Sequence, residues 1–232
     1  MSYPAFERAL YHVLKAGIPI EESLLSDALK TVDWYERAMW KGVRELYDGA
    51  ISTYEFESLM IDIISNQLRR AWNEGMRELG LNPEEDQTME GEMFLQNLMA
   101  EELVHVGPLA VDIRAEVSLT NPDITQFRNR VQMWANRYND TVNQAIAFYS
   151  NNDQRLKWTY GDTDHCDTCE ALDGLVAFAS EWETAGVVPQ SPPNPRLTCG
   201  GWKCQCSLTP TDQRRSPDAL TRILDAVTAG HV

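Results

Sequence analysis

The chain has 232 residues, of which 43% are hydrophobic, and it carries a formal net charge of −15. This length suits one large domain or two small ones, and the composition is that of a folded protein. No apolar run approaches the roughly 20 residues that a membrane-spanning helix needs. So strong a negative charge also argues against a protein that grips DNA through its phosphates.

Apolar residues recur with the period of an α-helix through most of the first 150 residues. Ser52 and Glu55 have the spacing of a capping box, which predicts a helix start. Gly107-Pro108 predicts the end of one helix, and Asn121-Pro122-Asp123 predicts the start of the last long one. The predicted helices span about residues 4–16, 20–47, 53–80, 84–106 and 123–149.

This helical half predicts no catalytic site. It contains no glycine-rich phosphate loop, no Gly-x-Ser-x-Gly elbow and no His-Glu-x-x-His motif. We interpret the apolar stripes as core packing. The paired acids Glu84-Glu85-Asp86 and Glu101-Glu102 are expected on solvated helix faces or beside helix N-termini.

The pattern changes after about residue 150. Residues 155–160 alternate like a strand, and residues 172–176 suggest a turn into a second short strand. Four prolines in residues 189–195 predict an extended connector. Residues 206–210 indicate a closing strand, and a short helix is predicted over residues 219–228.

All five cysteines of the chain lie in this last part: Cys166, Cys169, Cys199, Cys204 and Cys206. A Cys-x-x-Cys turn followed some thirty residues later by a second cysteine group is the spacing of a tetrahedral zinc site. Four thiolates would leave no open position for a substrate, so we expect one structural zinc ion per chain.

Which four of the five cysteines bind stays open at this level. Cys166 and Cys169 are the safest candidates. Cys199 and Cys204 bracket two glycines, which allow a tight reversal of the chain. Cys206 follows Cys204 by two residues, so in a strand both would point to the same face.

The residues beside the cysteines are less suitable metal ligands, and disulfides are a less suitable use of the thiols. His165 is adjacent to Cys166, but an exposed histidine beside the site is the favoured interpretation. Asp164 and Asp167 offer hard oxygen ligands, which suit a sulfur site poorly. Disulfides would leave one thiol over, and Met1 to Ala16 does not resemble a signal peptide, so a reducing compartment is expected.

Catalytic uses of the cysteines find little support. A zinc deaminase needs His-x-Glu before its cysteines, whereas His12 and His105 are followed two residues on by Leu14 and Gly107. A thioredoxin-like Cys-x-x-Cys would need a βαβ context that the chain lacks. We therefore expect a protein that is not an enzyme.

The expected fold is mainly α. A multi-helix N-terminal domain is predicted over residues 1–150, and a small α+β domain stapled by zinc over residues 151–212. A C-terminal helical tail is predicted over residues 213–232. Because a domain as short as the second has a small core, the metal would contribute substantially to its folding.

About fifty residues of the chain resemble the C-terminal domain of the phage minor head proteins of the Mu F-like head-morphogenesis family. That family joins a helical region to a small domain with the pattern Trp, Asp, Cys-x-x-Cys, Leu-Asp-Gly, Pro-Pro and His-Pro-x-Cys-Arg-Cys. The residues that carry the resemblance are Trp158, Asp164, Cys166, Cys169, Leu172-Asp173-Gly174, Cys204-Gln205-Cys206 and Leu208-Thr209-Pro210.

The chain departs from the family pattern at two places. Asn194-Pro195 and then Cys199 stand where the family has His-Pro, and Gln205 replaces the arginine between the last two cysteines. If the family histidine takes part in metal binding, Cys199 has taken over that position. The helical part shows no resemblance beyond being helical.

The resemblance implies a virion protein made in the bacterial cytoplasm and acting in head assembly near the portal. Its expected partners are portal or capsid proteins within a larger assembly, with no membrane and no specific nucleic acid. One alternative is a tail, neck or capsid-surface protein that shares only the zinc module. An alternative of another class is a metal-dependent hydrolase or toxin-like enzyme.

Overall fold

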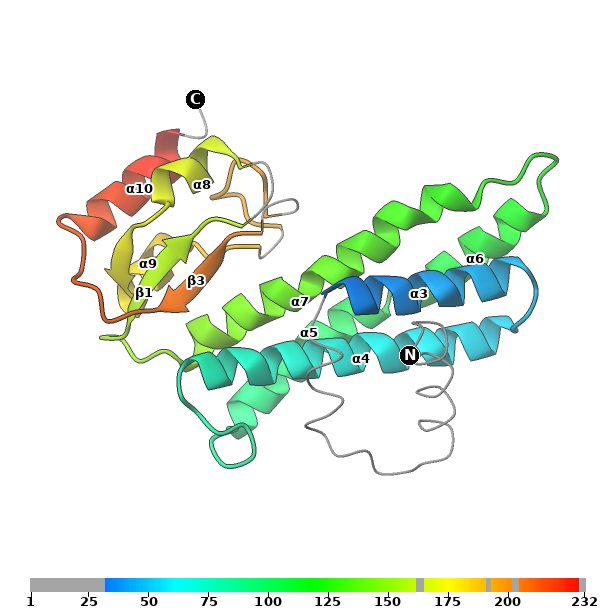
Figure 1. Ribbon diagram of the computed structural model, residues 1–232, viewed down its shortest axis with the longest axis horizontal. Helices are drawn as coiled ribbons and strands as arrows, with labels where there is room; N and C mark the ends of the chain where they lie inside the picture. Colours follow the sequence, from blue (N-terminus) through cyan, green and yellow to red (C-terminus); the bar gives the residue numbers. More distant parts are fainter. Residues whose placement is uncertain (1–31, 162–164, 191–192, 202–204, 230–232) are drawn as a thin grey trace, which may run out of the picture.

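The structure is a computed structural model that describes residues 32–161, 165–190, 193–201 and 205–229. It consists of an elongated helical body and a small module with a three-stranded sheet (Figure 1). The expectation of a mainly helical chain with a small α+β C-terminal part is confirmed. The elements are α3 (Val32–Tyr47), α4 (Thr53–Glu78), α5 (Met89–Leu103), α6 (Val106–Val117), η1 (Ile124–Phe127), α7 (Arg128–Tyr149), β1 (Arg155–Thr159), α8 (Asp167–Leu172), β2 (Val176–Phe178), α9 (Ala179–Ala185), β3 (Ser207–Pro210) and α10 (Ala219–Ala229).

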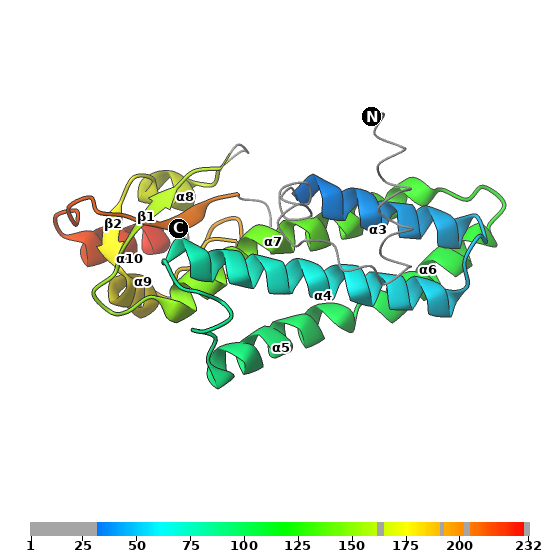
Figure 2. The ribbon, with the colours of Figure 1, turned by 60° about the horizontal axis from the view of Figure 1, so that its bottom comes forward.

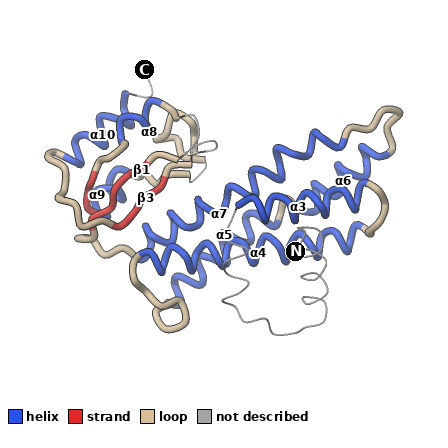
Figure 3. The backbone as a smooth tube through the Cα atoms, in the orientation of Figure 1, coloured by secondary structure: helices blue, strands red, loops and turns tan. Residues whose placement is uncertain are grey.

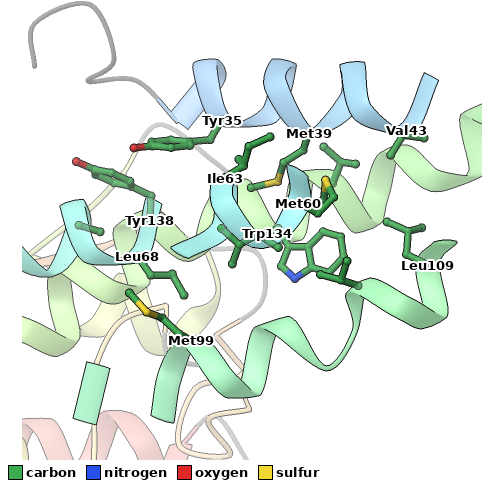
Figure 4. Packing of buried hydrophobic residues seen from close by; sticks show 14 of the residues in the cluster. Tyr35, Met39, Val43, Met60, Ile63, Leu68, Met99, Leu109, Trp134 and Tyr138 are labelled. Atoms are coloured by element: carbon green, nitrogen blue, oxygen red, sulfur yellow. The ribbon is translucent and has the colours of Figure 1, made fainter. Parts of the chain in front are cut away.

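The helical body is built around α4 and α7, the two longest helices of the described residues. The apolar stripes that predict these helices meet in one core, which α3, α5 and α6 complete. Figure 4 shows Met39 of α3, Met60 of α4 and Trp134 of α7 converging there. The predicted helix over residues 4–16 and the first part of the next one lie outside the described residues.

A glycine sets how closely α4 and α7 approach. A Cβ atom added to Gly75 of α4 would lie 2.5 Å from the carbonyl oxygen of Val142 and 2.7 Å from Cβ of Ala145, both on α7. Those distances are far below van der Waals contact, and the obstacle is backbone that cannot move aside. The helix pair therefore requires glycine at this position.

We predict that Gly75→Ala lowers the free energy of unfolding by about 2 kcal/mol, because overpacking forces the two helices apart. Urea denaturation followed by tryptophan fluorescence measures the effect. Gly107→Ala is the matched control, since a Cβ there meets only a carboxylate oxygen of Glu57 at 3.6 Å. If both variants changed stability equally, close approach at Gly75 would not matter.

The start of α4 follows its local sequence signal, whereas the starts of α5 and α6 differ from the prediction. The Ser52–Glu55 capping box is present, with each residue's amide bound by the other's side chain at 2.8 and 3.2 Å. The helix predicted over residues 84–106 corresponds to α5, which begins later, after the Thr88 cap, and α6, which begins at Val106, is not among the predicted helices. Pro108 lies in the first turn of α6, where the missing N–H costs no hydrogen bond.

The C-terminal module has an antiparallel sheet of order β2-β1-β3 (Figure 3). All three strands match the strand predictions to within a residue or two, whereas α8 and α9 were not predicted. The sheet, α8, α9 and α10 share a second core that includes Trp158, Trp182 and Ile223. The terminal helix therefore packs into this module and is part of its core.

The two parts are joined along the C-terminal end of α7. Ile146 of α7 belongs to the core of the module, and α7 also packs against β3. Figure 2 shows the module at one end of the helical body, next to α7. In the part of the chain that the structure describes, no helix is both long enough and apolar enough to cross a membrane.

Candidate metal centre

The first cysteine pair lies where β1 gives way to α8. Cys166 occupies the N-cap position of α8 with extended backbone angles, and Cys169 follows in the first turn. This geometry turns both side chains the same way, and their Sγ atoms lie 3.4 Å apart. Cys169 is buried and Cys166 is half-buried.

Cys199 comes from a compact loop that the proline-rich connector enters. The amide of Asn194 donates to the Gly200 carbonyl at 3.0 Å, and the amide of Gly200 donates to the Leu197 carbonyl at 2.8 Å. Gly200 and Gly201 have φ values of 64° and 82°, so the reversal that the two glycines predict is present. The loop carries Cys199 back toward α8.

Two threonines hold the cysteine segments together. Oγ1 of Thr168 lies 2.6 Å from Oγ1 of Thr198, and the Thr198 amide donates to Thr168 Oγ1 at 3.3 Å. Each threonine precedes a cysteine of the cluster, and Thr168 is buried. The hydrogen bonds therefore fix the distance between Cys169 and Cys199.

The outcome is a cluster of three thiols. The Sγ atoms of Cys166, Cys169 and Cys199 all lie within 4.8 Å of one another, close enough to hold one metal ion. In a tetrahedral zinc site with Zn–S bonds of about 2.3 Å, neighbouring sulfur atoms are about 3.8 Å apart. Soft sulfur donors at this spacing fit zinc, and the same residues would fit other thiophilic ions.

The remaining two cysteine candidates differ in what the structure says of them. Cys204 lies outside the described residues. Cys206 is buried, and its Sγ atom lies 3.8 Å from Nδ1 of His165. His165 is half-buried and stacks flat on Tyr160, with ring centroids 3.8 Å apart, so it is not the exposed neighbour that was expected.

The Leu-Asp-Gly turn has a clear structural use at each position. Leu172 is buried in the core of the module, and Asp173 accepts a hydrogen bond from the Tyr160 amide at 3.1 Å. Gly174 has a φ of 72°, which other residues rarely adopt, and its amide donates to the Trp158 carbonyl. The turn thereby joins the cysteine helix to the central strand.

Two buried side-chain amides hold the backbone around Cys206 in place, and the sequence analysis did not predict them. Asn143 of α7 donates to the Cys206 carbonyl at 3.2 Å and accepts from the Leu208 amide at 3.0 Å. Gln190 donates to the same Cys206 carbonyl at 2.7 Å. Asn143 lies about 140° around the helix from Tyr138 and about 60° from Ile146. A single amide on a helix gives no local signal of a backbone partner more than 60 positions away.

We predict that Thr168→Val weakens metal binding about tenfold, because residues that orient ligands typically contribute that much. The change keeps the side-chain shape and removes the hydroxyl that bonds to Thr198. Competition with a chromogenic zinc chelator measures the affinity. Thr184→Val is the matched control, since Thr184 is exposed and bonds only within its own helix; equal affinities in both variants would contradict the prediction.

A second group of charged residues lies between α5 and α7. Nε of Arg137 lies 2.6 Å from Glu102, and Nη1 lies 2.9 Å from Asp140. The expectation that Glu102 belongs to a solvated face is wrong, because its side chain is only 12% exposed. Burial raises the pKa of the Asp140 carboxyl from its usual 3.8 to about 7, although Gln144 and Arg137 oppose the shift.

We predict that Asp140 makes the protein less stable as the pH rises from about 4 to about 7. In that range the folded protein keeps a proton on Asp140 that the unfolded chain has lost. The free energy of unfolding is therefore highest below about pH 4 and falls as the pH rises to the raised pKa of about 7. Urea denaturation across this range should show a steeper decline for the wild type than for Asp140→Asn. Parallel curves would contradict the raised pKa.

Comparisons with protein-family models, with curated proteins and with solved structures return no match to this chain.

Proposed function

We propose that this chain is a non-enzymatic minor head protein of a bacteriophage, and that it acts in head assembly near the portal. In this proposal the C-terminal module holds one structural zinc ion through Cys166, Cys169, Cys199 and a fourth cysteine. The helical body and the module would dock onto portal or capsid proteins.

The observation that carries the proposal is the convergence of the motif residues in one small module. Trp158 lies in its core, the Leu-Asp-Gly turn links its helix to its central strand, and Cys166 and Cys169 lie together beside that turn. Cys199 joins these two thiols from a distant segment, as expected if it has replaced the histidine of the family pattern. The position directly after a long helix also agrees with the family arrangement.

The chemistry of the thiol cluster favours a structural metal. When bound, zinc would cross-link α8 to the loop of Cys199 and so stabilise a module whose core is small. The residues themselves hold this arrangement through the Thr168–Thr198 pair and the buried Cys169. With a fourth cysteine beside these three, four thiolates would fill the tetrahedral site and leave no position for a substrate.

The charge of the chain is compatible with a place near packaged DNA. A net charge of −15 repels phosphates, so the genome would not adhere to this protein during packaging. Contacts would then be with proteins, and such contacts need exposed surfaces that a partner can cover.

Quantitative mass spectrometry of purified particles of the phage that encodes this chain tests the proposal. We expect the chain in a few copies per particle, with chemical cross-links to the portal protein. Absence from purified particles would overturn a virion function. Copy numbers as high as those of the shell protein, or cross-links only to tail proteins, would favour a shell or tail component.

A further inference from the structure

Helix α5 is apolar on two opposite faces. One face packs against α4 and buries Leu95 and Met99. The opposite face is bare: Met89 is 73% exposed, Met93 is 60% exposed and Val104, at the end of the helix, is 65% exposed. Helices that are apolar all round are normally covered on all sides.

The bare apolar residues lie along one side of α5 in two pairs, with the exposed Asn97 on the turn between them. Met89, Met93, Ala100 and Val104 are separated by four, seven and four residues, so they lie on the same side of the helix. Ala100 is exposed as well. We call these four residues the α5 stripe; it is about 22 Å long, which matches the length of a partner helix of four turns.

The α5 stripe lies in a strongly acidic region. Residues 78–113 contain nine Asp or Glu residues and no Lys or Arg. Glu90 and Glu101 are exposed beside the stripe, and Glu84 and Glu85 are exposed just before the helix. Among the described residues none of these four carboxylates has an ion pair, whereas Glu92 and Glu102 are paired with Arg69 and Arg137.

Nothing in the described part of the chain covers the α5 stripe. Figure 2 shows α5 at the outer edge of the helical body, with α4 on its inner side. An apolar stripe bordered by polar residues on a folded protein is typical of a surface that binds another protein. Methionine is well suited to such a surface, because its flexible side chain adapts to different partners.

We infer that the α5 stripe docks a basic amphipathic helix of a partner protein. The apolar face of that helix would cover Met89 and Met93, and its Lys or Arg residues would meet Glu90 and Glu101. The same charges disfavour a second copy of this chain, since two acidic borders would face each other. This inference concerns the helical body and does not depend on the proposed function.

The test uses the full chain and a fluorescent peptide of leucine and lysine, about 18 residues long, with the leucines at helical spacing. Two peptides serve as comparisons. One has the same composition in scrambled order, and the other has leucine and glutamate at helical spacing. We expect binding of the first peptide, at least tenfold weaker binding to a Met89→Gln/Met93→Gln variant, and a reduced salt dependence in Glu90→Gln/Glu101→Gln.

Because a chain of this charge attracts any cationic peptide, the methionine variant is decisive, as it leaves the charge unchanged. Val111→Gln on α6 is the matched control, since Val111 is equally exposed but lies outside the stripe. Peptide binding should also slow the oxidation of Met89 and Met93 by peroxide, with buried Met39 and Met60 as unreactive references.

Three outcomes would overturn the inference. The first is equal binding of the helical and scrambled lysine peptides. The second is a Met89→Gln/Met93→Gln variant that binds the helical lysine peptide as tightly as the wild type does and has the same melting temperature. The third is a dimer of the wild-type chain in sedimentation that the methionine variant converts to monomer, because a second copy would then be the occupant.

Discussion

Cys169→Ser is expected to abolish metal binding and to unfold the C-terminal module. Cys169 is fully buried, belongs to the core of the module and lies within the thiol cluster. In small zinc domains the metal contributes about 10 kcal/mol or more to folding, so the loss of a central ligand removes most of that stabilisation. Elemental mass spectrometry of the purified chain should give about one zinc per wild-type chain and little in the variant.

Near-ultraviolet circular dichroism would report the loss of packing around Trp158 and Trp182, whose rings lie 5.6 Å apart. Serine variants at Cys199, Cys204 and Cys206 complete the set and identify the fourth ligand, because only true ligands should lower the zinc content. Wild-type chain treated with a chelator should resemble Cys169→Ser. A Cys169→Ser chain that keeps its zinc would refute the proposed ligand set.

Asn143→Leu is expected to lower the free energy of unfolding by about 3 kcal/mol and to loosen the joint between α7 and the module. Leucine is branched at the same carbon as asparagine but is larger, and it cannot form the hydrogen bonds to Pro189, Cys206 and Leu208. The Leu208 amide would then lose its side-chain partner inside a buried region, which costs more than the hydrogen bond itself contributes. The Cys206 carbonyl would keep only its hydrogen bond from Gln190.

Urea denaturation gives the change in stability, and limited proteolysis after α7 reports whether the joint opens. Gln132→Leu is the matched control, because Gln132 is an exposed amide on the same helix. If Asn143→Leu were as stable and as resistant to protease as Gln132→Leu, the prediction would be contradicted. The contact between α7 and the module would then depend on apolar packing alone.

Much of the helical body was predictable because its signals are local. The apolar period and the Ser52–Glu55 box identify α4 to within a residue or two. The error at Gly107-Pro108 has a local cause as well: proline disfavours a helix interior but is accepted in a first turn, and the sequence alone does not say which turn it occupies. The ion pair that shields Glu102 from solvent could not be predicted, because its partner Arg137 is far away in the chain.

By itself the sequence determined the helical class, the strands of the module and the pairing of Cys166 with Cys169, since each depends on residues within a few positions of one another. Only the tertiary structure decided that Cys199 joins that pair, that Asn143 supports Cys206, and that one face of α5 is left bare. These features arise between segments that are distant in the chain, where distance and burial depend on how whole elements pack and no local pattern reports them.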